Sequence, residues 1–232
     1  MKKVGIIGAM ELEVSSLKNN MTIERKITKA GMEFCEGILK GTKVVVVRSG
    51  VGKVNAGICT QILSDIFGIS HVINTGVGGS LNSSLDVGDI IISNDAIQHD
   101  MDAVDFGYPK GEIPQMGVKE FIANPKLADL AFNTAKELFP EIKIIKGRIL
   151  TGDRFISSIA AKKVLDEEFN GDCCEMEGAA IAHAAYLNNI PFVIIRAVSD
   201  NADKPADTDY YTFERVYAQR SAKLVEELVG LI

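Results

Sequence analysis

The sequence predicts a single α/β domain over residues 1–232, with a central mixed β-sheet flanked by helices. Three observations support this fold class. Short apolar runs bounded by glycine alternate with longer stretches of helical periodicity. The run at 192–195 is continuously apolar, which is typical of a central strand buried on both faces. No repeat, low-complexity tract or linker divides the chain.

The apolar runs define the predicted strands. A tight turn at Gly41-Thr42 separates the second run from the third, which predicts a hairpin at that point. The complete set of predicted strands is 4–7, 33–39, 44–47, 71–74, 89–93, 142–150 and 192–195.

Helical spacing of apolar residues predicts the helices between these strands. Glu11 and Glu13 open the first helix, and Gly68 ends the second. Asn124 followed by Pro125 is a typical helix start, because the side chain of Asn124 can cap the helix and Pro125 suits its first position. The helices after the first are predicted at 54–67, 126–138, 160–168 and 176–188, and from a cap at Thr208 to near 228.

The composition narrows the possible functions. With 25 basic and 31 acidic residues the net charge is −6, and only 6% of residues are aromatic, so we expect no nucleic-acid partner. No apolar run approaches the ~18 residues of a membrane span, so we expect no membrane association. The four cysteines form no C-x-x-C pair, which predicts reduced thiols in a cytoplasmic protein.

Glycine-rich segments follow three of the predicted strands. They are Gly8-Ala9-Met10, Ser49-Gly50-Val51-Gly52 and Gly76-Val77-Gly78-Gly79. Ligands of open α/β sheets bind beyond the carboxyl ends of strands, and glycine lets a ligand approach the backbone closely. These segments therefore indicate a ligand site, although each is also consistent with a simple tight turn. None matches the dinucleotide fingerprint.

Charged residues lie close to these segments. Glu13 falls beside the apolar stripe of the first helix, although an acid in a first turn also favours the helix dipole. Glu177 begins an apolar helical row and needs a partner, whereas the row of Glu175 is predicted to be more exposed. Arg196 and Asp200 follow the central strand, where Arg196 could form a structural ion pair with Asp200 or with Glu177.

The longest irregular stretch is 98–124, and a segment of this length is usually functional or contains an unrecognised element. It includes His99-Asp100-Met101-Asp102, whose residue types suit a hard metal ion. Their spacing matches no known ligand pattern, so we predict a solvated acidic loop and no metal.

Six blocks in order along the chain resemble one family. They are Val4-Gly5-Ile6-Ile7-Gly8-Ala9-Met10-Glu11-Leu12-Glu13, Ser49-Gly50-Val51-Gly52-Lys53-Val54-Asn55-Ala56, Asn74-Thr75-Gly76, Gly152-Asp153-Arg154-Phe155-Ile156, Glu175-Met176-Glu177-Gly178-Ala179-Ala180 and Arg196-Ala197-Val198-Ser199-Asp200. Over essentially its full length the chain resembles bacterial 5′-methylthioadenosine/S-adenosylhomocysteine nucleosidases of the purine nucleoside phosphorylase superfamily. The family commonly has Ser at the position of Val77, and often Phe at that of Tyr210.

The resemblance implies a nucleoside phosphorylase-like fold and hydrolysis of the N-glycosidic bond of adenine nucleosides, with no cofactor, in methionine salvage. By position, Glu13 would be the base that activates water, and Asp200 the acid that protonates adenine N7. Glu177 and the Met176 backbone would hold the ribose hydroxyls, with Arg196 nearby. This agrees with the chemistry, because a departing purine needs a proton and a ribosyl cation needs nearby anions.

The remaining implied contacts concern the base, the 5′ group and a partner subunit. Phe155 would stack on adenine, the Ile156 backbone would read its edge, and Gly79 would lie against the nucleoside. The resemblance also implies a homodimer in which each subunit completes the other's 5′-thioalkyl pocket. The residues lining that pocket would be Ala103, Phe106 and Pro114 from the partner, with Tyr210 closing it.

Three alternatives remain open. A phosphorylase of the same fold would need arginines for phosphate, but the first turn carries Glu11 and Glu13, which would repel a dianion. A futalosine-type hydrolase would act on a different 5′ substituent. A non-catalytic nucleoside-binding protein would be expected to lack the acid or the base, whereas Glu13 and Asp200 are both present.

Overall fold

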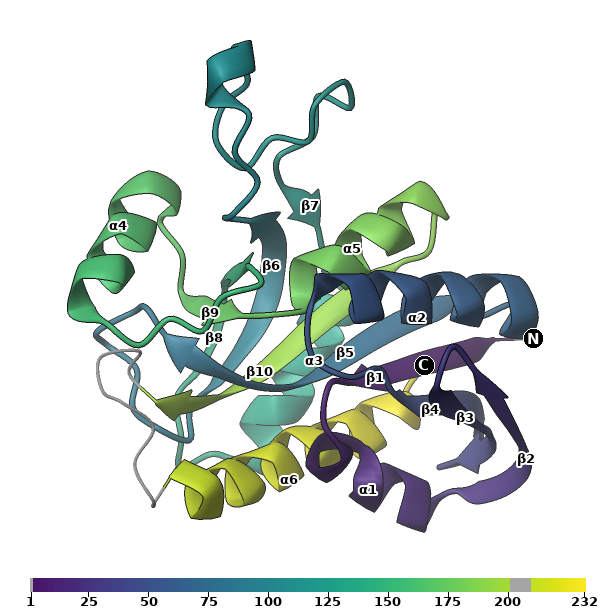
Figure 1. Cartoon of the computed structure of the whole chain (residues 1–232). Coiled ribbons are helices and arrows are strands. Elements are labelled where there is room, and N and C mark those ends of the chain that lie inside the picture. The colour runs from purple at the N-terminus through teal and green to yellow at the C-terminus, as the bar shows by residue number, and fades with distance from the viewer. Residues whose placement is uncertain (1, 201–209) are drawn as a thin grey trace.

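The computed structural model describes residues 2–200 and 210–232, and the side chains of 210–215 lie outside that description. Ten strands of the described residues join one mixed sheet (Figure 1). In chain order they are β1 (Lys3–Gly8), β2 (Thr22–Lys29), β3 (Met32–Leu39), β4 (Thr42–Arg48), β5 (His71–Ser80), β6 (Ile90–Gln98), β7 (Phe121–Ile122), β8 (Ile144–Thr151), β9 (Cys173–Glu175) and β10 (Phe192–Asp200).

Helices pack against both faces of this sheet. They are α1 (Glu11–Asn20), α2 (Lys53–Phe67), α3 (Pro125–Leu138), α4 (Ile159–Phe169), α5 (Gly178–Leu187) and α6 (Tyr210–Val229), with a short 3-10 helix η1 (Val104–Phe106). In Figure 1, α1 and α6 lie below the sheet and α2 and α5 above it. The predicted fold class is therefore confirmed.

The strand pairing explains how the sheet curves. Strand β5 is parallel to β1 and β10, while β10 is antiparallel to β6 and β9 is antiparallel to β5. Because β6 also pairs with β8, and β8 with β9, the strands β5, β10, β6, β8 and β9 close into a small barrel. Strands β1, β4, β3 and β2 extend from β5 as an open wing.

The apolar core divides between the two faces of the sheet. In β1, Val4 and Ile6 pack with Leu17 and Leu224, on the side of α1 and α6. Ile7 points the other way, into the cluster that includes the α2 and α5 residues. Side chains of a strand alternate between faces, so both faces of β1 must be apolar, as its sequence already indicated.

Several local predictions are confirmed. The β3–β4 hairpin forms, and Gly68 ends α2 in the left-handed conformation. The Asn124 side chain caps α3 by accepting a hydrogen bond from the Leu127 N–H at 3.1 Å, with Pro125 as the first helical residue. The run at 192–195 lies in β10, which pairs with both β5 and β6 and is therefore central. The predicted cap Thr208 lies outside the described residues.

Other predictions were wrong. Strand β2 was not predicted, because half of its residues are charged and most of its side chains are exposed. The segment Gly76–Gly79 is not a turn but the second half of β5. The helix predicted from 176 begins only at Gly178, since Cys173–Glu175 forms strand β9.

The irregular stretch 98–124 projects from the body of the molecule (Figure 1). It contains η1 and ends in β7, which returns to pair with β6. At the tip, Val104 and Phe106 are 53% and 85% exposed. Such apolar exposure on a projecting segment indicates a surface that contacts another molecule.

Candidate active site

A pocket opens at the carboxyl ends of β1 and β4 and along the second half of β5. The pocket lies where the open wing meets the barrel. The segments that follow several different strands therefore contribute side chains to its lining. Its lining consists of Ala9, Met10, Glu13, Val51, Val77, Gly78, Gly79, Arg154, Phe155, Ile156, Cys174, Glu175, Met176, Glu177, Ser199 and Asp200.

Glu13 enters the pocket from the first turn of α1 and is only 3% exposed. One carboxylate oxygen, Oε2, accepts a hydrogen bond from the Met10 N–H at 2.9 Å. The other, Oε1, accepts one from the Val77 N–H at 3.2 Å, so Val77 contributes its backbone to the site. Burial raises the pKa of Glu13, although the charge of Arg196 and these N–H groups oppose the shift.

Two glycines make room for this carboxylate. A Cβ on Gly76 would lie 2.5 Å from Glu13 Oε1, and a Cβ on Gly8 would lie 2.9 Å from Glu13 Cβ. Neither glycine has a positive φ, so close approach rather than a turn explains their presence. Two of the glycine-rich segments therefore do indicate the site. Their glycines leave room for the Glu13 side chain, rather than for a ligand as expected from the sequence.

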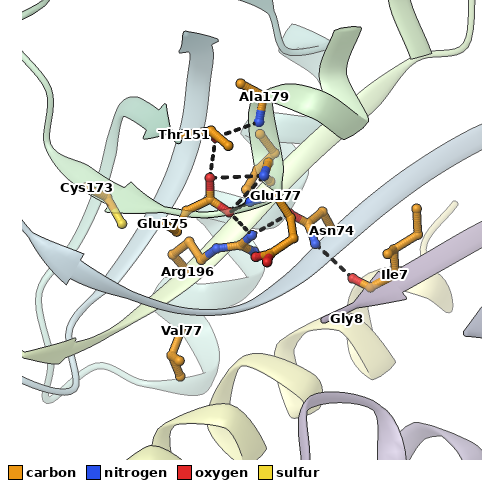
Figure 2. A network of polar contacts seen from close by, with 12 residues as sticks. Ile7, Gly8, Asn74, Val77, Thr151, Cys173, Glu175, Glu177, Ala179 and Arg196 are labelled. Carbon is orange, nitrogen blue, oxygen red and sulfur yellow. Dashed lines mark hydrogen bonds and ion pairs between the residues drawn. The ribbon is translucent and has the colours of Figure 1, made fainter. Parts of the chain in front are cut away.

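Arg196 lies behind the pocket wall, 2% exposed, in the middle of β10 (Figure 2). Its guanidinium forms an ion pair with Glu175 and donates from Nη2 to the Asn74 side-chain oxygen at 2.6 Å. Asn74 in turn donates to the Ile7 carbonyl at 2.9 Å, which ties Arg196 to β1. The partner is thus Glu175, and the expectation of a pair with Asp200 or Glu177 was wrong.

Glu175 is also buried, contrary to the expectation of an exposed helical row. Its carboxylate accepts hydrogen bonds from the Thr151 hydroxyl, from the Glu177 N–H at 3.1 Å and from the Gly178 N–H at 2.8 Å (Figure 2). These bonds satisfy free N–H groups at the start of α5, which explains why the helix begins after Glu177 rather than before it.

Glu177 occupies the N-cap position of α5 and is 6% exposed. Its Oε1 accepts a hydrogen bond from the Gly52 N–H at 2.8 Å, in the loop between β4 and α2. Burial raises the pKa of Glu177, and the neighbouring charge of Glu175 raises it further, while Arg196 opposes the shift. Three buried carboxyl groups thus share a single buried guanidinium.

Asp200 ends β10 on the opposite wall. A register shift between Val198 and Asp200 brings Asp200 opposite Gly79 of β5. The Ser199 hydroxyl donates to Asp200 Oδ2 at 2.7 Å. Asp200 and Glu13 therefore both line the pocket but come from different strand ends, as their placement in the sequence indicated.

The segment after β8 supplies a further part of the pocket lining. Phe155 is 51% exposed at the rim and Ile156 is buried at 7%. Met176 and Gly79 also line the pocket. The structure therefore brings together Glu13, Asp200, Gly79, Phe155, Ile156, Met176 and Glu177, with Arg196 directly behind them.

Three predicted contact residues with described side chains are not among those lining this pocket. Ala103, Phe106 and Pro114 lie on the projecting segment between β6 and β7. Tyr210 is the first residue of α6, and its side chain is outside the described part of the chain. Within the described residues no group of three or more potential ligands could hold a metal ion.

The family follows from the whole chain. Residues 3–230 match the model of the phosphorylase superfamily. A 5′-methylthioadenosine/S-adenosylhomocysteine nucleosidase of Staphylococcus aureus (strain JH9) is 43% identical over 228 residues, covering 98% of this chain and 99% of that protein. The chain belongs to this nucleosidase family.

Solved structures of other nucleosidases agree. The enzyme of Neisseria meningitidis, in complex with methylthio-immucillin-A, superposes with a TM-score of 0.95 at 37% identity, covering 100% of both chains. That of Colwellia psychrerythraea 34H, in complex with adenine, has a TM-score of 0.93 at 39% identity, covering 99% of this chain and 95% of that chain.

Sequence reasoning missed two residues that support the site, Asn74 and Thr151, and the structural role of Glu175. Asn74 and Thr151 each stand at the polar end of an apolar run, which is the signal that could have singled them out. Glu175 carried no such signal for its burial, because its side-chain partners, Thr151 in β8 and Arg196 in β10, are distant in sequence.

Proposed function

We propose that this nucleosidase hydrolyses the N-glycosidic bond of 5′-methylthioadenosine and S-adenosylhomocysteine, releasing adenine and the corresponding 5-thioribose. The observation that carries the proposal is that Glu13, Glu177 and Asp200 all line one pocket. Hydrolysis of a glycosidic bond requires a base for water and an acid for the leaving group.

Glu13 is the proposed base. Its carboxylate takes a proton from water, and the water oxygen forms a bond to C1′ of the ribose. The hydrogen bonds from Met10 and Val77 hold the carboxylate in one orientation, so it is positioned before substrate binds. The raised pKa of Glu13 brings it closer to the neutral range in which a general base is most effective.

Asp200 is the proposed acid. As the C1′–N9 bond breaks, its electron pair moves into the purine ring, and Asp200 supplies the proton that N7 takes up. Without that proton the leaving group would be an adenine anion. Removing the charge from the leaving group lowers the barrier by the amount typical of general acids, roughly 10²–10⁴ in rate.

The sugar and the base are held by separate segments. Glu177, aided by the Met176 backbone, would bind the ribose hydroxyls, while Arg196 would fix the surrounding charge. Phe155 would stack on adenine, Ile156 would read its edge through the backbone, and Gly79 would leave room for the nucleoside. The Glu13 carboxylate also places negative charge near the cationic ribosyl group of the transition state.

Hydrolysis is favoured over phosphorolysis by the charge of the pocket. Among its described lining residues are four carboxyl side chains and one arginine, Arg154. The buried Arg196 is already paired with Glu175. A phosphate dianion beside the sugar would therefore be repelled by the Glu13 carboxylate, whereas neutral water would not.

We also propose a homodimer in which Ala103, Phe106 and Pro114 of each subunit complete the partner's 5′-thioalkyl pocket, with Tyr210 closing it. Exposed apolar side chains lie along α2, α5, β7 and η1, which supports such an interface. They include Val54 at 70%, Ile58 at 43%, Leu187 at 61%, Ile122 at 63% and Phe106 at 85% exposure.

The proposed setting is the cytoplasm, with a role in methionine salvage. The four cysteines are all buried free thiols, which is consistent with a reducing compartment. No helix of the described chain combines the length and the apolar character needed to cross a bilayer.

The reaction class can be tested on the purified enzyme. With 5′-methylthioadenosine in phosphate-free buffer we expect stoichiometric adenine and 5-methylthioribose, separated by chromatography. Added phosphate should not change the products. If adenine appeared only with phosphate, and a sugar 1-phosphate accumulated, hydrolysis would be the wrong reaction.

A further inference from the structure

The acidic segment 98–102 has a role that neither a metal site nor a solvated loop explains. Asp100 follows β6 and does not line the pocket. Its Oδ1 accepts a hydrogen bond from Lys53 Nζ at 2.6 Å, and its Oδ2 accepts one from the Asp153 N–H at 2.9 Å. The carboxylate thus bridges the start of α2 and the segment after β8.

Lys53 and Asp153, the two residues that Asp100 bridges, also contact each other directly. The Asp153 carboxylate accepts a hydrogen bond from the Lys53 N–H at 2.8 Å, so Lys53, Asp100 and Asp153 form a triangle of polar contacts. Burial alone would raise the pKa of Asp100, but the bonds from Lys53 and Asp153 outweigh it and hold the pKa below its usual range. Asp100 therefore stays charged at neutral pH, and the triangle stays intact.

Each corner of the triangle adjoins a different part of the pocket. Lys53 follows Gly52, whose N–H binds the carboxylate of Glu177 on the sugar side. Asp153 precedes Phe155 and Ile156 by two and three residues, on the base side. A residue outside the pocket, Asp100, therefore adds to the direct Lys53–Asp153 bond in holding the sugar-side and base-side segments together.

We propose that Asp100 is a positioning residue for nucleoside binding. Through Lys53 and Asp153 it holds the base-side segment 153–156 at a fixed spacing from the loop that anchors Glu177. This inference rests on the proposed placement of adenine against Phe155 and Ile156. Removing the bridge should loosen the base-side segment and weaken adenine binding more than it slows the bond-breaking step.

The test compares Asp100→Asn, Lys53→Met and the double variant in the full-length enzyme. Calorimetry measures the Kd of adenine alone, and steady-state kinetics give KM and kcat for 5′-methylthioadenosine. We expect each single variant to raise the Kd and KM about two- to fivefold, as for a partly exposed ion pair. We expect kcat to change less, and the double variant to bind no more weakly than the weaker single variant.

A matched control is Glu36→Gln. The Lys3–Glu36 pair spans 2.7 Å, and its side chains are 22% and 16% exposed, against 18% and 29% for Lys53 and Asp100. It lies in the open wing, so adenine affinity should be unchanged. An equal loss of affinity in Glu36→Gln, or additive losses in the double variant, would overturn the positioning role.

Phe155→Ala separates this inference from the proposed function. If Phe155→Ala weakens adenine binding but Asp100→Asn does not, Asp100 is not a positioning residue, and the proposed base site stands. If Phe155→Ala leaves adenine binding unchanged, the proposed base site is wrong, and the inference falls with it.

Discussion

Helix α1 lies between two charged regions that differ in how their charges are arranged. On one side is the pocket, where Glu13, Glu175 and Glu177 are buried around a single buried arginine. On the other is a cleft between α1 and the β2–β3 hairpin, lined by Glu11, Lys18, Lys26, Glu33 and Arg48 among others.

In the cleft each of these acids has a basic partner, and the acid itself is exposed, Glu11 at 54% and Glu33 at 47%. Lys18 Nζ lies 2.9 Å from Glu11 and Lys26 Nζ lies 3.2 Å from Glu33. Water can replace any of these partners, so the pairs contribute little. In the pocket, acids outnumber the arginine and water is largely excluded. There N–H donors hold each of the three glutamate carboxyl groups in place. Burying these acids together costs electrostatic free energy, and we attribute this arrangement to the proposed chemistry.

The largest expected effect comes from Glu13→Gln, which keeps the shape but removes the base. We expect kcat to fall by roughly 10²–10⁴ while the nucleoside still binds. Steady-state kinetics and the binding of methylthio-immucillin-A measure the two effects separately. Near-normal turnover in Glu13→Gln would show that another group activates water.

Arg196→Met breaks the buried ion pair and should lower the free energy of unfolding by about 3–5 kcal/mol, because the Glu175 charge is left without its partner. Urea unfolding measures this change. Arg48→Met, in the cleft, is the matched control and should stay within about 0.5 kcal/mol. Similar losses of unfolding free energy in Arg196→Met and Arg48→Met would show that a charge in the pocket matters no more to stability than one in the cleft.

Glu177→Gln tests the free-energy cost of burying an acidic side chain in the pocket. It should change the free energy of unfolding less than Arg196→Met does. The raised pKa of Glu177 means that the folded state keeps its proton where the unfolded state loses it, above the usual value of 4.5. The contribution of Glu177 to stability therefore falls as pH rises through its folded-state pKa.

Because glutamine does not titrate, Glu177→Gln should lose less stability than the unmodified protein between about pH 5 and about pH 8. Urea unfolding at both pH values measures the difference. A steeper decline in the variant would contradict the raised pKa. Nucleoside binding should weaken, since charge-assisted bonds to the ribose hydroxyls are lost.

The smallest effect is expected for Glu11→Gln, two residues from Glu13. It removes a favourable dipole interaction and the contact with Lys18, which together are worth a few tenths of a kcal/mol to about one. Turnover should be unchanged. An inactive Glu11→Gln together with an active Glu13→Gln would show that the wrong glutamate has been proposed as the base.

The difference between contacts that are local in sequence and contacts between distant residues explains what the sequence could predict. Elements defined by local chemistry were predicted well: Asn124 caps α3, β10 is central, and Glu13 lies beside an apolar stripe. Each depends on residues that are close together along the chain, so the signal is visible without the fold.

Features held by distant partners could not be predicted. The start of α5 is set by the Glu175 carboxylate, which is itself fixed by Thr151 and Arg196. Gly76 belongs to a strand because β10 pairs alongside it, although glycine disfavours strands on its own. The partner of Arg196 was wrongly predicted for the same reason.

Strand β2 is the outermost strand of the open wing, so one of its sides has no neighbour in the sheet. An exposed strand edge can recruit a strand from another molecule and start aggregation. Here four of eight residues are charged, Glu24, Arg25, Lys26 and Lys29, and a bulge interrupts the pairing between Ile23 and Arg25. Both features discourage added strands. We therefore expect the proposed homodimer to form away from this edge.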